Sequence, residues 1–301
     1  MELVTSGVYK MVENMGSEQS WGGISCLNAV PLRTHVLESS FWLMFLIGSY
    51  FYMEIPTITK KFIQDASSLN LANLSIRKLS PNHWSEYLRI TIGWILCVVH
   101  FILIAHMLIC KWNARILIYV LQPCHLMLIF QFCALFASAV FSSAVAVFTI
   151  PPMVGAYLAI AFPDTSGLDQ VLEVEAYWAE HVVITMVTPV FLLCRDGYSL
   201  KLLQFSYIFL GVWLLILYHW AILEPIDVFT LVNVDFMLCP TSAMKEVFRM
   251  VSQSLIWPSY RSTITIIVAF LGWPLSYFYK LLAALLGTLY MGGISGTKKY
   301  L

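Results

Sequence analysis

Long apolar stretches dominate this chain. Seven of them approach the ~20 mostly apolar residues that a helix needs to cross the hydrocarbon core of a bilayer, at residues 35–55, 88–110, 117–139, 140–162, 174–194, 200–222 and 263–286. Only 11% of the 301 residues are charged and 59% are hydrophobic, whereas soluble domains carry about a quarter charged residues. The pattern therefore predicts a polytopic membrane protein.

The apolar stretches are predicted to be helices, because backbone polar groups inside a bilayer must be satisfied within the chain. The expected fold is an all-α transmembrane bundle, with a kink at Pro151-Pro152 in the fourth stretch. The third and fourth stretches are joined with almost no polar linker, which predicts a tight hairpin; a re-entrant hairpin would lower the count from seven spans to six. The expected regions are a polar N-terminal segment (1–33), a transmembrane domain (34–290) and a C-terminal tail (291–301).

Positive charges in the connections indicate the orientation of a membrane protein. With seven spans, and with long polar connections at 56–86 and 224–261, nine Lys and Arg residues lie on the side of the C-terminus and seven on the other. This favours a cytosolic C-terminus. The chain ends in Lys298-Lys299-Tyr300-Leu301, which has the form of a dilysine retrieval signal read by a receptor. We therefore expect a multi-pass protein of the endoplasmic reticulum, although a simple basic tail explains the lysines equally well.

The cysteines are scattered, and most lie within apolar runs. No Cys-x-x-Cys pair occurs, so neither a disulfide framework nor a zinc site is expected, and we expect no metal or other cofactor. The seven are Cys26, Cys97, Cys110, Cys124, Cys133, Cys194 and Cys239.

Cys124 is the candidate nucleophile, because polar reactive groups inside a membrane span are costly and are functional candidates by default. Pro123 places Cys124 near the start of a helix, and a helix N-terminus favours the thiolate, which is the nucleophilic form. His125 is a poor partner for it, since consecutive helical residues point about 100° apart. The base should come from another helix. The alternative interpretation is that Cys124 is a small apolar side chain that only fills space.

His181 is the best candidate for that base. Glu173, Tyr177 and His181 recur at helical spacing and share a face, so Tyr177 can orient the imidazole. Glu180 is expected to point elsewhere. Glu175 adds a second acidic group in the first turn, where carboxylates also simply complement the helix dipole. His181 can instead be a packing residue bonded to a carbonyl group.

Span parity places the candidate groups at one end of the bundle. The third and fifth stretches run in the same direction and the sixth runs opposite, so Cys124, His181 and His219 should lie at similar depth. Asp235, in the connection that follows, belongs to the same side, which is the lumenal side under the predicted orientation. His125 and His219 are candidates for orienting or oxyanion-stabilising groups, although His219 also fits packing or interfacial anchoring.

Several separated motifs resemble the transmembrane protein 164 family. They are Leu121-Gln122-Pro123-Cys124-His125, Glu173-Val174-Glu175 with Tyr177 and His181, Tyr218-His219, and Asn233 with Met237-Leu238-Cys239-Pro240. The motifs agree in order and spacing from about the second stretch to Pro240, and the resemblance fades in the N-terminal region and the first connection. Gln122 and Asp235 depart from the family pattern, where Asn is expected at both positions.

The resemblance implies a cysteine-centred acyltransferase of the endoplasmic reticulum membrane. Such an enzyme moves polyunsaturated acyl chains from a donor phospholipid to lyso or ether phospholipids, and is linked to lipid peroxidation and ferroptosis. The resemblance also implies that Cys124 accepts the acyl group and that His181 is its base. The implied partners are a phospholipid donor and a lysophospholipid acceptor. A formal net charge of zero gives no indication of nucleic-acid binding.

Two other function classes stay open at this point. A lipid ester hydrolase on the same scaffold would use water in place of the acceptor alcohol. A seven-helix receptor or transporter would not be an enzyme at all. Inverted repeats or paired broken helices would favour a transporter, and the sequence shows only the Pro-Pro break. A receptor usually carries a disulfide between extracellular loops, which the cysteine placement does not indicate.

Overall fold

The computed structural model describes residues 22–77, 83–113, 117–165, 168–195, 203–240 and 259–291. The longer helices are α4 (Leu32–Tyr52), α5 (Ile55–Arg77), α6 (His83–Asn113), α7 (Pro123–Phe136), α13 (Phe205–Leu217) and α17 (Tyr260–Met291). The shorter ones are α3 (Ile24–Ala29), α8 (Ala139–Thr149), α9 (Met153–Ala161), α10 (Glu173–Val182), α11 (Thr188–Arg195) and α14 (Glu224–Thr230). Two 3₁₀ turns, η1 (Leu117–Leu121) and η4 (Val234–Phe236), complete the described part together with two π-helical stretches.

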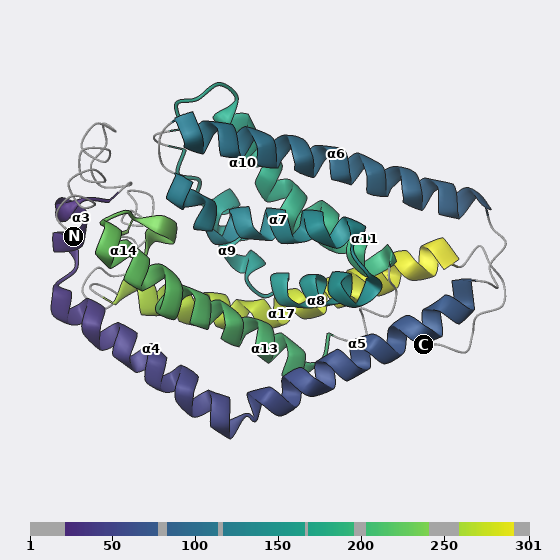
Figure 1. Ribbon diagram of the computed structural model, residues 1–301, viewed down its shortest axis with the longest axis horizontal. Coiled ribbons are helices and arrows are strands. Elements are labelled where there is room, and N and C mark those ends of the chain that lie inside the picture. Colours follow the sequence, from purple (N-terminus) through teal and green to yellow (C-terminus); the bar gives the residue numbers. More distant parts are fainter. Residues whose placement is uncertain are drawn as a thin grey trace.

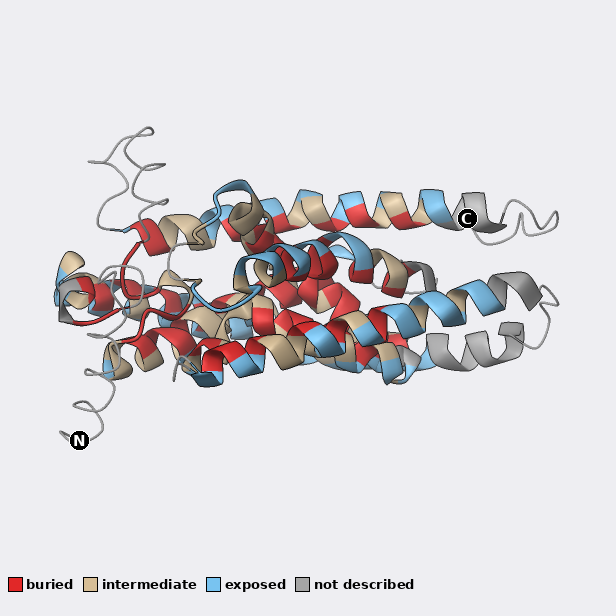
Figure 2. Cartoon of the chain, turned by 90° about the horizontal axis from the view of Figure 1, so that it is seen from above, coloured by how far each residue is buried: buried red, intermediate tan, exposed pale blue. Residues whose placement is uncertain are grey.

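The helices form an elongated bundle (Figure 1). Helices α4 and α5 make a V along one margin, α6 runs along the opposite margin, and the remaining helices lie between them. Figure 2 shows buried residues on the inner faces of the helices and exposed residues on the outer faces. The outer faces carry large apolar side chains such as Phe51, Ile109 and Phe270, which are 71%, 59% and 74% exposed. Extended apolar surface of this kind is stable against lipid and not against water.

The all-α membrane fold is confirmed, whereas the predicted count of seven spans is not. Among the described residues, four helical stretches are long and apolar enough to cross a membrane, namely Tyr87–Asn113, Glu173–Leu193, Phe205–Thr230 and Tyr260–Leu286. The pair α4 and α5, bent by 63°, would make a fifth. Helix α7 is apolar but has only 14 residues.

Prolines divide the third and fourth predicted spans. The stretch 117–139 becomes η1 followed by α7, which begins afresh at Pro123. The stretch 140–162 becomes α8 and α9, separated by a turn at 150–152 that contains Pro151 and Pro152. Proline lacks an N–H donor and clashes with the preceding turn, so the predicted kink at this pair is confirmed as a complete break.

The prediction that residues 56–86 form a polar loop is largely wrong. Residues 56–77 of the expected polar loop 56–86 lie in helix α5 instead, and residues 83–86 lie in α6. Glu54 adopts a left-handed backbone conformation (φ 50°) and ends the preceding helix, while Pro56 lies in the first turn of α5, where a missing N–H costs nothing. The polar residues of this segment therefore belong to a second helical arm rather than to a loop.

Two helical runs contain a π-helical stretch, η2 (Val183–Val187) between α10 and α11, and η3 (Tyr218–Leu223) between α13 and α14. Each keeps its helix continuous. The sixth predicted span therefore does not end at residue 222 but continues through α14 to Thr230. π-helical turns are rare and occur frequently at functional sites.

One disulfide contradicts the expectation of none. Cys26 of α3 is bonded to Cys239, which lies 213 residues away in the segment after η4. The neighbouring backbone is held too, because Gly23 N–H donates to Leu231 O at 2.7 Å. At Gly22 (φ 123°) an added Cβ would lie 2.2 Å from the same carbonyl, so only glycine fits. No local spacing marks such a pair, since the two cysteines lie 213 residues apart in the sequence.

A buried ion cluster joins α4, α14 and α17 near the disulfide. Arg261, 2% exposed, donates to Glu38 at 2.9 Å through Nε and to Glu224 at 2.6 Å through Nη1. Nη1 also lies 2.9 Å from Met237 O. Removing one partner of such a pair leaves an uncompensated buried charge, so the cluster fixes the three helices at this end of the bundle. The dilysine at Lys298-Lys299 and most of the segment 1–33 lie outside the described residues.

Candidate functional site

A cavity of about 360 Å³ opens between the helices at the disulfide end of the bundle. Its wall comes from α6, η1, α7, α9, α10, α13, η3, η4 and α17. The cavity brings together most of the candidate residues named from the sequence: Cys124, His125, Tyr177, His181, His219 and Asp235. Glu175 is the exception, because its side chain is exposed and does not line the cavity. The predicted meeting of the third, fifth and sixth stretches at one depth is therefore seen in the structure.

Cys124 is a free, partly buried thiol in the first turn of α7. Gln122 is the N-cap residue and makes no side-chain capping bond, and the first intrahelical bond runs from Leu126 N–H to Gln122 O at 3.1 Å. The backbone N–H groups of Cys124 and His125 precede that bond, so they have no partner within the helix. The thiol thus lies beside unused amide donors and the positive end of the helix dipole.

His181 is buried (5% exposed) and has one ring nitrogen available. Its Nδ1–H donates to Tyr177 O at 2.7 Å, which leaves Nε2 with the lone pair in the neutral ring. The Tyr177 ring packs against the imidazole with centroids 4.2 Å apart, but its hydroxyl donates to Ala159 O of α9 at 2.7 Å. Tyr177 therefore orients His181 through its backbone carbonyl and ring, and not through the phenol that the helical spacing suggested.

No hydrogen bond joins the Cys124 sulfur to His181 or His125 within the described part of the chain. The two helices nevertheless present the thiol and the imidazoles to the same cavity. The catalytic pairing of Cys124 with His181 accordingly stays a prediction, and catalytic hydrogen bonds are often long before a substrate binds.

Glu180 corrects the sequence interpretation, which had it pointing elsewhere. The side chain is buried (6% exposed) and lines the cavity, with Oε2 lying 3.8 Å from His125 Nε2. Helix α10 packs against α6, α7 and α9. A wide sector of α10 is therefore enclosed, and both Glu180 and His181 lie inside it although they point about 100° apart.

His219 and Asp235 form a close pair. His219 Nε2 lies 2.6 Å from Asp235 Oδ2, and Nδ1 lies 2.9 Å from Leu215 O. Both neighbours are acceptors, so the two bonds are satisfied together when the ring carries both protons and Asp235 is ionised. In that state His219 has no lone pair, and both of its N–H groups are engaged by Leu215 and Asp235, so it borders the cavity as a fixed cation rather than as a base.

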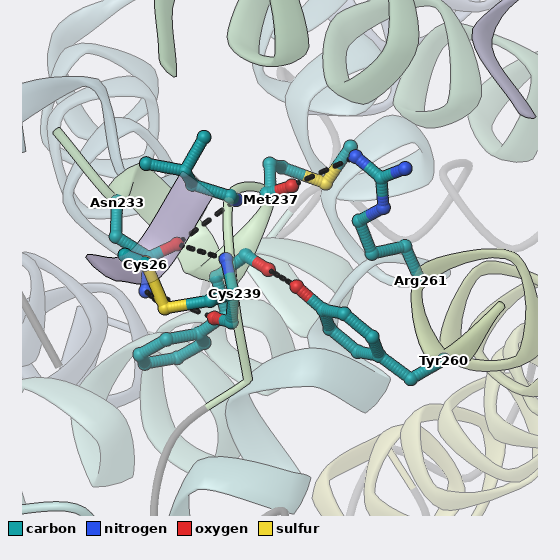
Figure 3. The surroundings of a disulfide bond; sticks show 8 residues. Cys26, Asn233, Met237, Cys239, Tyr260 and Arg261 are labelled. Atoms are coloured by element: carbon teal, nitrogen blue, oxygen red, sulfur yellow. Dashed lines mark hydrogen bonds between the residues drawn. A yellow bond between two sulfur atoms is a disulfide. The ribbon is translucent and has the colours of Figure 1, made fainter. Parts of the chain in front are cut away.

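The segment 231–239 contains Asp235, and the disulfide attaches its end, Cys239, to Cys26 (Figure 3). Asn233 Oδ1 accepts from the N–H groups of Leu238 (2.9 Å) and Cys239 (3.1 Å), and its Nδ2 donates to Cys239 O at 2.9 Å. Tyr260 O–H donates to Phe236 O at 2.6 Å. These bonds hold Asp235 in its left-handed conformation (φ 53°) beside His219.

Two further polar groups line the cavity and were not recognised as site residues in the sequence. Lys111, 6% exposed, donates to Glu173 at 3.1 Å, although span counting had treated Lys111 only as a loop charge. His106 Nε2–H donates to Val171 O at 2.8 Å and lies 3.6 Å from the Cys110 sulfur. An i, i+4 His-Cys pair on α6 was the available signal. No cluster of three or more His, Cys, Asp or Glu side chains that could hold a metal ion occurs among the described residues.

A family model described as the TMEM164 family matches residues 33–277, which is most of the chain and includes every lining residue discussed above. No solved structure matches the chain.

Proposed function

The chain belongs to the TMEM164 family, and on that premise we propose that it is a cysteine-dependent phospholipid acyltransferase. Cys124 is the nucleophile and His181 its base. The enzyme moves acyl chains, polyunsaturated ones among them, from a donor phospholipid to lyso or ether phospholipids. The observation that carries the proposal is the shared cavity, in which a thiol at a helix N-terminus meets an imidazole with an available Nε2.

The size and lining of the cavity suit the ester region of a lipid. A volume of about 360 Å³ lies at the lower end of the range of small-molecule sites, so it accommodates the glycerol ester while acyl chains extend between the helices. Residues such as Leu103, Met107 and Val268 make much of the wall apolar. Exclusion of water favours transfer to an alcohol over hydrolysis.

The reaction proceeds in two half-reactions. Cys124 passes its proton to His181 and attacks the donor ester carbonyl; the carbon–oxygen bond breaks and a lysophospholipid leaves, with a thioester remaining on the sulfur. In the second half, an acceptor hydroxyl attacks the thioester, the carbon–sulfur bond breaks, and Cys124 is regenerated. In the simplest scheme His181 returns its proton to the leaving oxygen and later accepts the proton of the acceptor hydroxyl.

The tetrahedral intermediates of both halves need donors for their negative oxygen. The unused backbone N–H groups of Cys124 and His125 lie at the start of α7, beside the sulfur itself. An acyl group bonded to that sulfur would place its carbonyl oxygen close to them. This arrangement needs neither coenzyme A nor a metal ion.

We also propose that the cavity faces the lumen of the endoplasmic reticulum. Disulfides persist in oxidising compartments, and Cys26–Cys239 lies at the cavity end of the bundle, next to the lining residue Met237. Helix α17 starts at this end and runs to the opposite one (Figure 1), which is compatible with a cytosolic dilysine. Protease digestion of a C-terminal tag after selective permeabilisation of the plasma membrane tests this; a protected tag would reverse the orientation.

The decisive experiment compares purified wild type with Cys124→Ala in detergent, using a phospholipid with a labelled sn-2 acyl chain and a lysophospholipid acceptor. We expect labelled diacyl product from the wild type and none from Cys124→Ala. Cys133→Ala is the matched control, since Cys133 is a free, exposed thiol on the same helix, and it should keep full activity. Labelled free fatty acid without acylated lysolipid would identify a hydrolase instead, and no reaction by the wild type would refute the enzyme proposal.

A further inference from the structure

One buried carboxyl group in the cavity has an oxygen with nothing to bind. Glu180 is 6% exposed, and within the described part of the chain its Oε1 has no hydrogen-bond partner. A buried polar oxygen left without a partner is destabilising, so such a group calls for an explanation. Because Glu180 lines the cavity, the missing partner can be a donor on the bound ligand.

The other oxygen of Glu180 lies near His125. His125 Nδ1–H donates to Tyr119 O at 2.6 Å, which fixes the ring and turns Nε2 toward Glu180 Oε2 at 3.8 Å. This separation is longer than a hydrogen bond and can close when a ligand binds. His125 thus lies next to one carboxyl oxygen while Oε1 stays open to the cavity.

Two consecutive pairs consequently face one another across the cavity. Cys124-His125 begins α7, and Glu180-His181 lies on α10, which packs against α7. The sulfur that carries the acyl group and the open carboxyl oxygen therefore border one space, with a histidine next to each in the sequence. Glu180 has an imidazole of the opposite helix, His125, as its neighbour, and the Cys124 thiol shares the cavity with the imidazole of His181.

Resting on the acyltransferase function proposed above, we propose that Glu180 binds the hydroxyl group of the alcohol substrate through Oε1 and exchanges its proton. The alcohol is the acceptor lysophospholipid in one half-reaction and the departing lysophospholipid in the other. His125 acts as a positioning residue for Glu180. His181 then serves the thiol alone, as the base that takes the Cys124 proton and returns it.

The proton and bond balance closes over a full cycle. At rest Glu180 is the neutral acid, which is the form that burial favours, Cys124 is the thiol and His181 is the neutral base. During acylation Cys124 passes its proton to His181 and forms the carbon–sulfur bond, the donor carbon–oxygen bond breaks, and the Glu180 proton goes to the leaving oxygen. During transfer the acceptor O–H gives its proton to Glu180, a carbon–oxygen bond forms, the carbon–sulfur bond breaks, and the departing sulfur takes its proton back from His181.

The test separates the two half-reactions with an activated donor. A p-nitrophenyl ester of a long-chain fatty acid releases p-nitrophenolate, a leaving group that needs no proton. Purified full-length Glu180→Gln should therefore acylate Cys124 within about 3-fold of the wild-type rate, as measured by intact-protein mass spectrometry. Transfer from the acyl-enzyme to a lysophospholipid should fall by about 100-fold or more, which is the usual range for loss of a general base.

Two controls define the outcome. Glu175→Gln removes a carboxylate from the exposed side of the same helix and should leave both steps unchanged. Acylation of Cys124 by Glu180→Gln at close to the wild-type rate shows that the variant is folded, and hydroxylamine, which cleaves thioesters, should discharge both acyl-enzymes, which shows that the adduct is a thioester. Wild-type transfer by Glu180→Gln, or an equal loss in both steps, would overturn the assignment of Glu180. Failure of wild-type protein to form acyl-Cys124 would instead overturn the acyltransferase proposal, and this assignment with it.

Discussion

Removing the Cys26–Cys239 disulfide should destabilise the cavity end of the bundle measurably. The bond closes a loop of 213 residues, for which the chain-entropy relation gives about 5 kcal/mol at 25 °C. Helices that stay in detergent or lipid after unfolding restrict the chain already, so we expect about 2–4 kcal/mol in practice. At roughly 2–4 °C per kcal/mol for chains of this order of size, Cys26→Ser should lower Tm by about 5–15 °C.

The assay is thermal unfolding of the purified protein in detergent, followed by intrinsic fluorescence. Cys239→Ser and reduced wild type should show the same shift as Cys26→Ser, because all three lack the same bond. Cys133→Ser, which removes an exposed free thiol, should not shift Tm. Mass spectrometry establishes that the bond is present in the oxidised wild type. If the bond is present and its loss moves Tm by less than about 2 °C, the reasoning from loop closure is refuted.

Two further substitutions test the supports of the same region. Arg261→Met should destabilise the fold by about 3–5 kcal/mol, because it leaves Glu38 and Glu224 buried without their cation; Tm measurement checks this, and a neutral effect would show that the carboxyl groups are satisfied otherwise. Asn233→Ala removes three hydrogen bonds that hold the segment 231–239 and should cost about 1–3 kcal/mol. Faster proteolysis within this segment is the readout, and unchanged cleavage would contradict the bracing role.

The general character of the fold could be predicted, since each apolar stretch is a local property of the sequence. The Pro151-Pro152 break was equally readable, because proline acts on its own turn. Span parity also brought Cys124, His181 and His219 to one end of the bundle, as the shared cavity shows. That inference used the direction of each stretch, which was taken from the count of seven spans.

The remaining features depend on contacts that sequence spacing does not contain. Cys26 and Cys239 are 213 residues apart, so nothing local links them. Glu180 was placed away from the site because helical spacing defines one face at a time, whereas α10 is enclosed by three other helices. The first connection appeared to be a loop because of its lysines, although long charged side chains on a helix can extend toward water.

The π-helical stretch η2 has a consequence for how this bundle tolerates insertions and deletions. Widening the turn leaves carbonyl groups that other helices use: Gln131 of α7 donates to Ile184 O at 2.9 Å, and Tyr279 of α17 donates to Thr185 O. Deleting one residue from Val183–Val187 would restore an ordinary α-helix and rotate everything beyond it by about 100° relative to His181. The helix would gain internal hydrogen bonds but lose the two hydrogen bonds from α7 and α17. The extra residue of η2 therefore supports hydrogen bonds between helices. Its loss would weaken the packing of the bundle without breaking any helix.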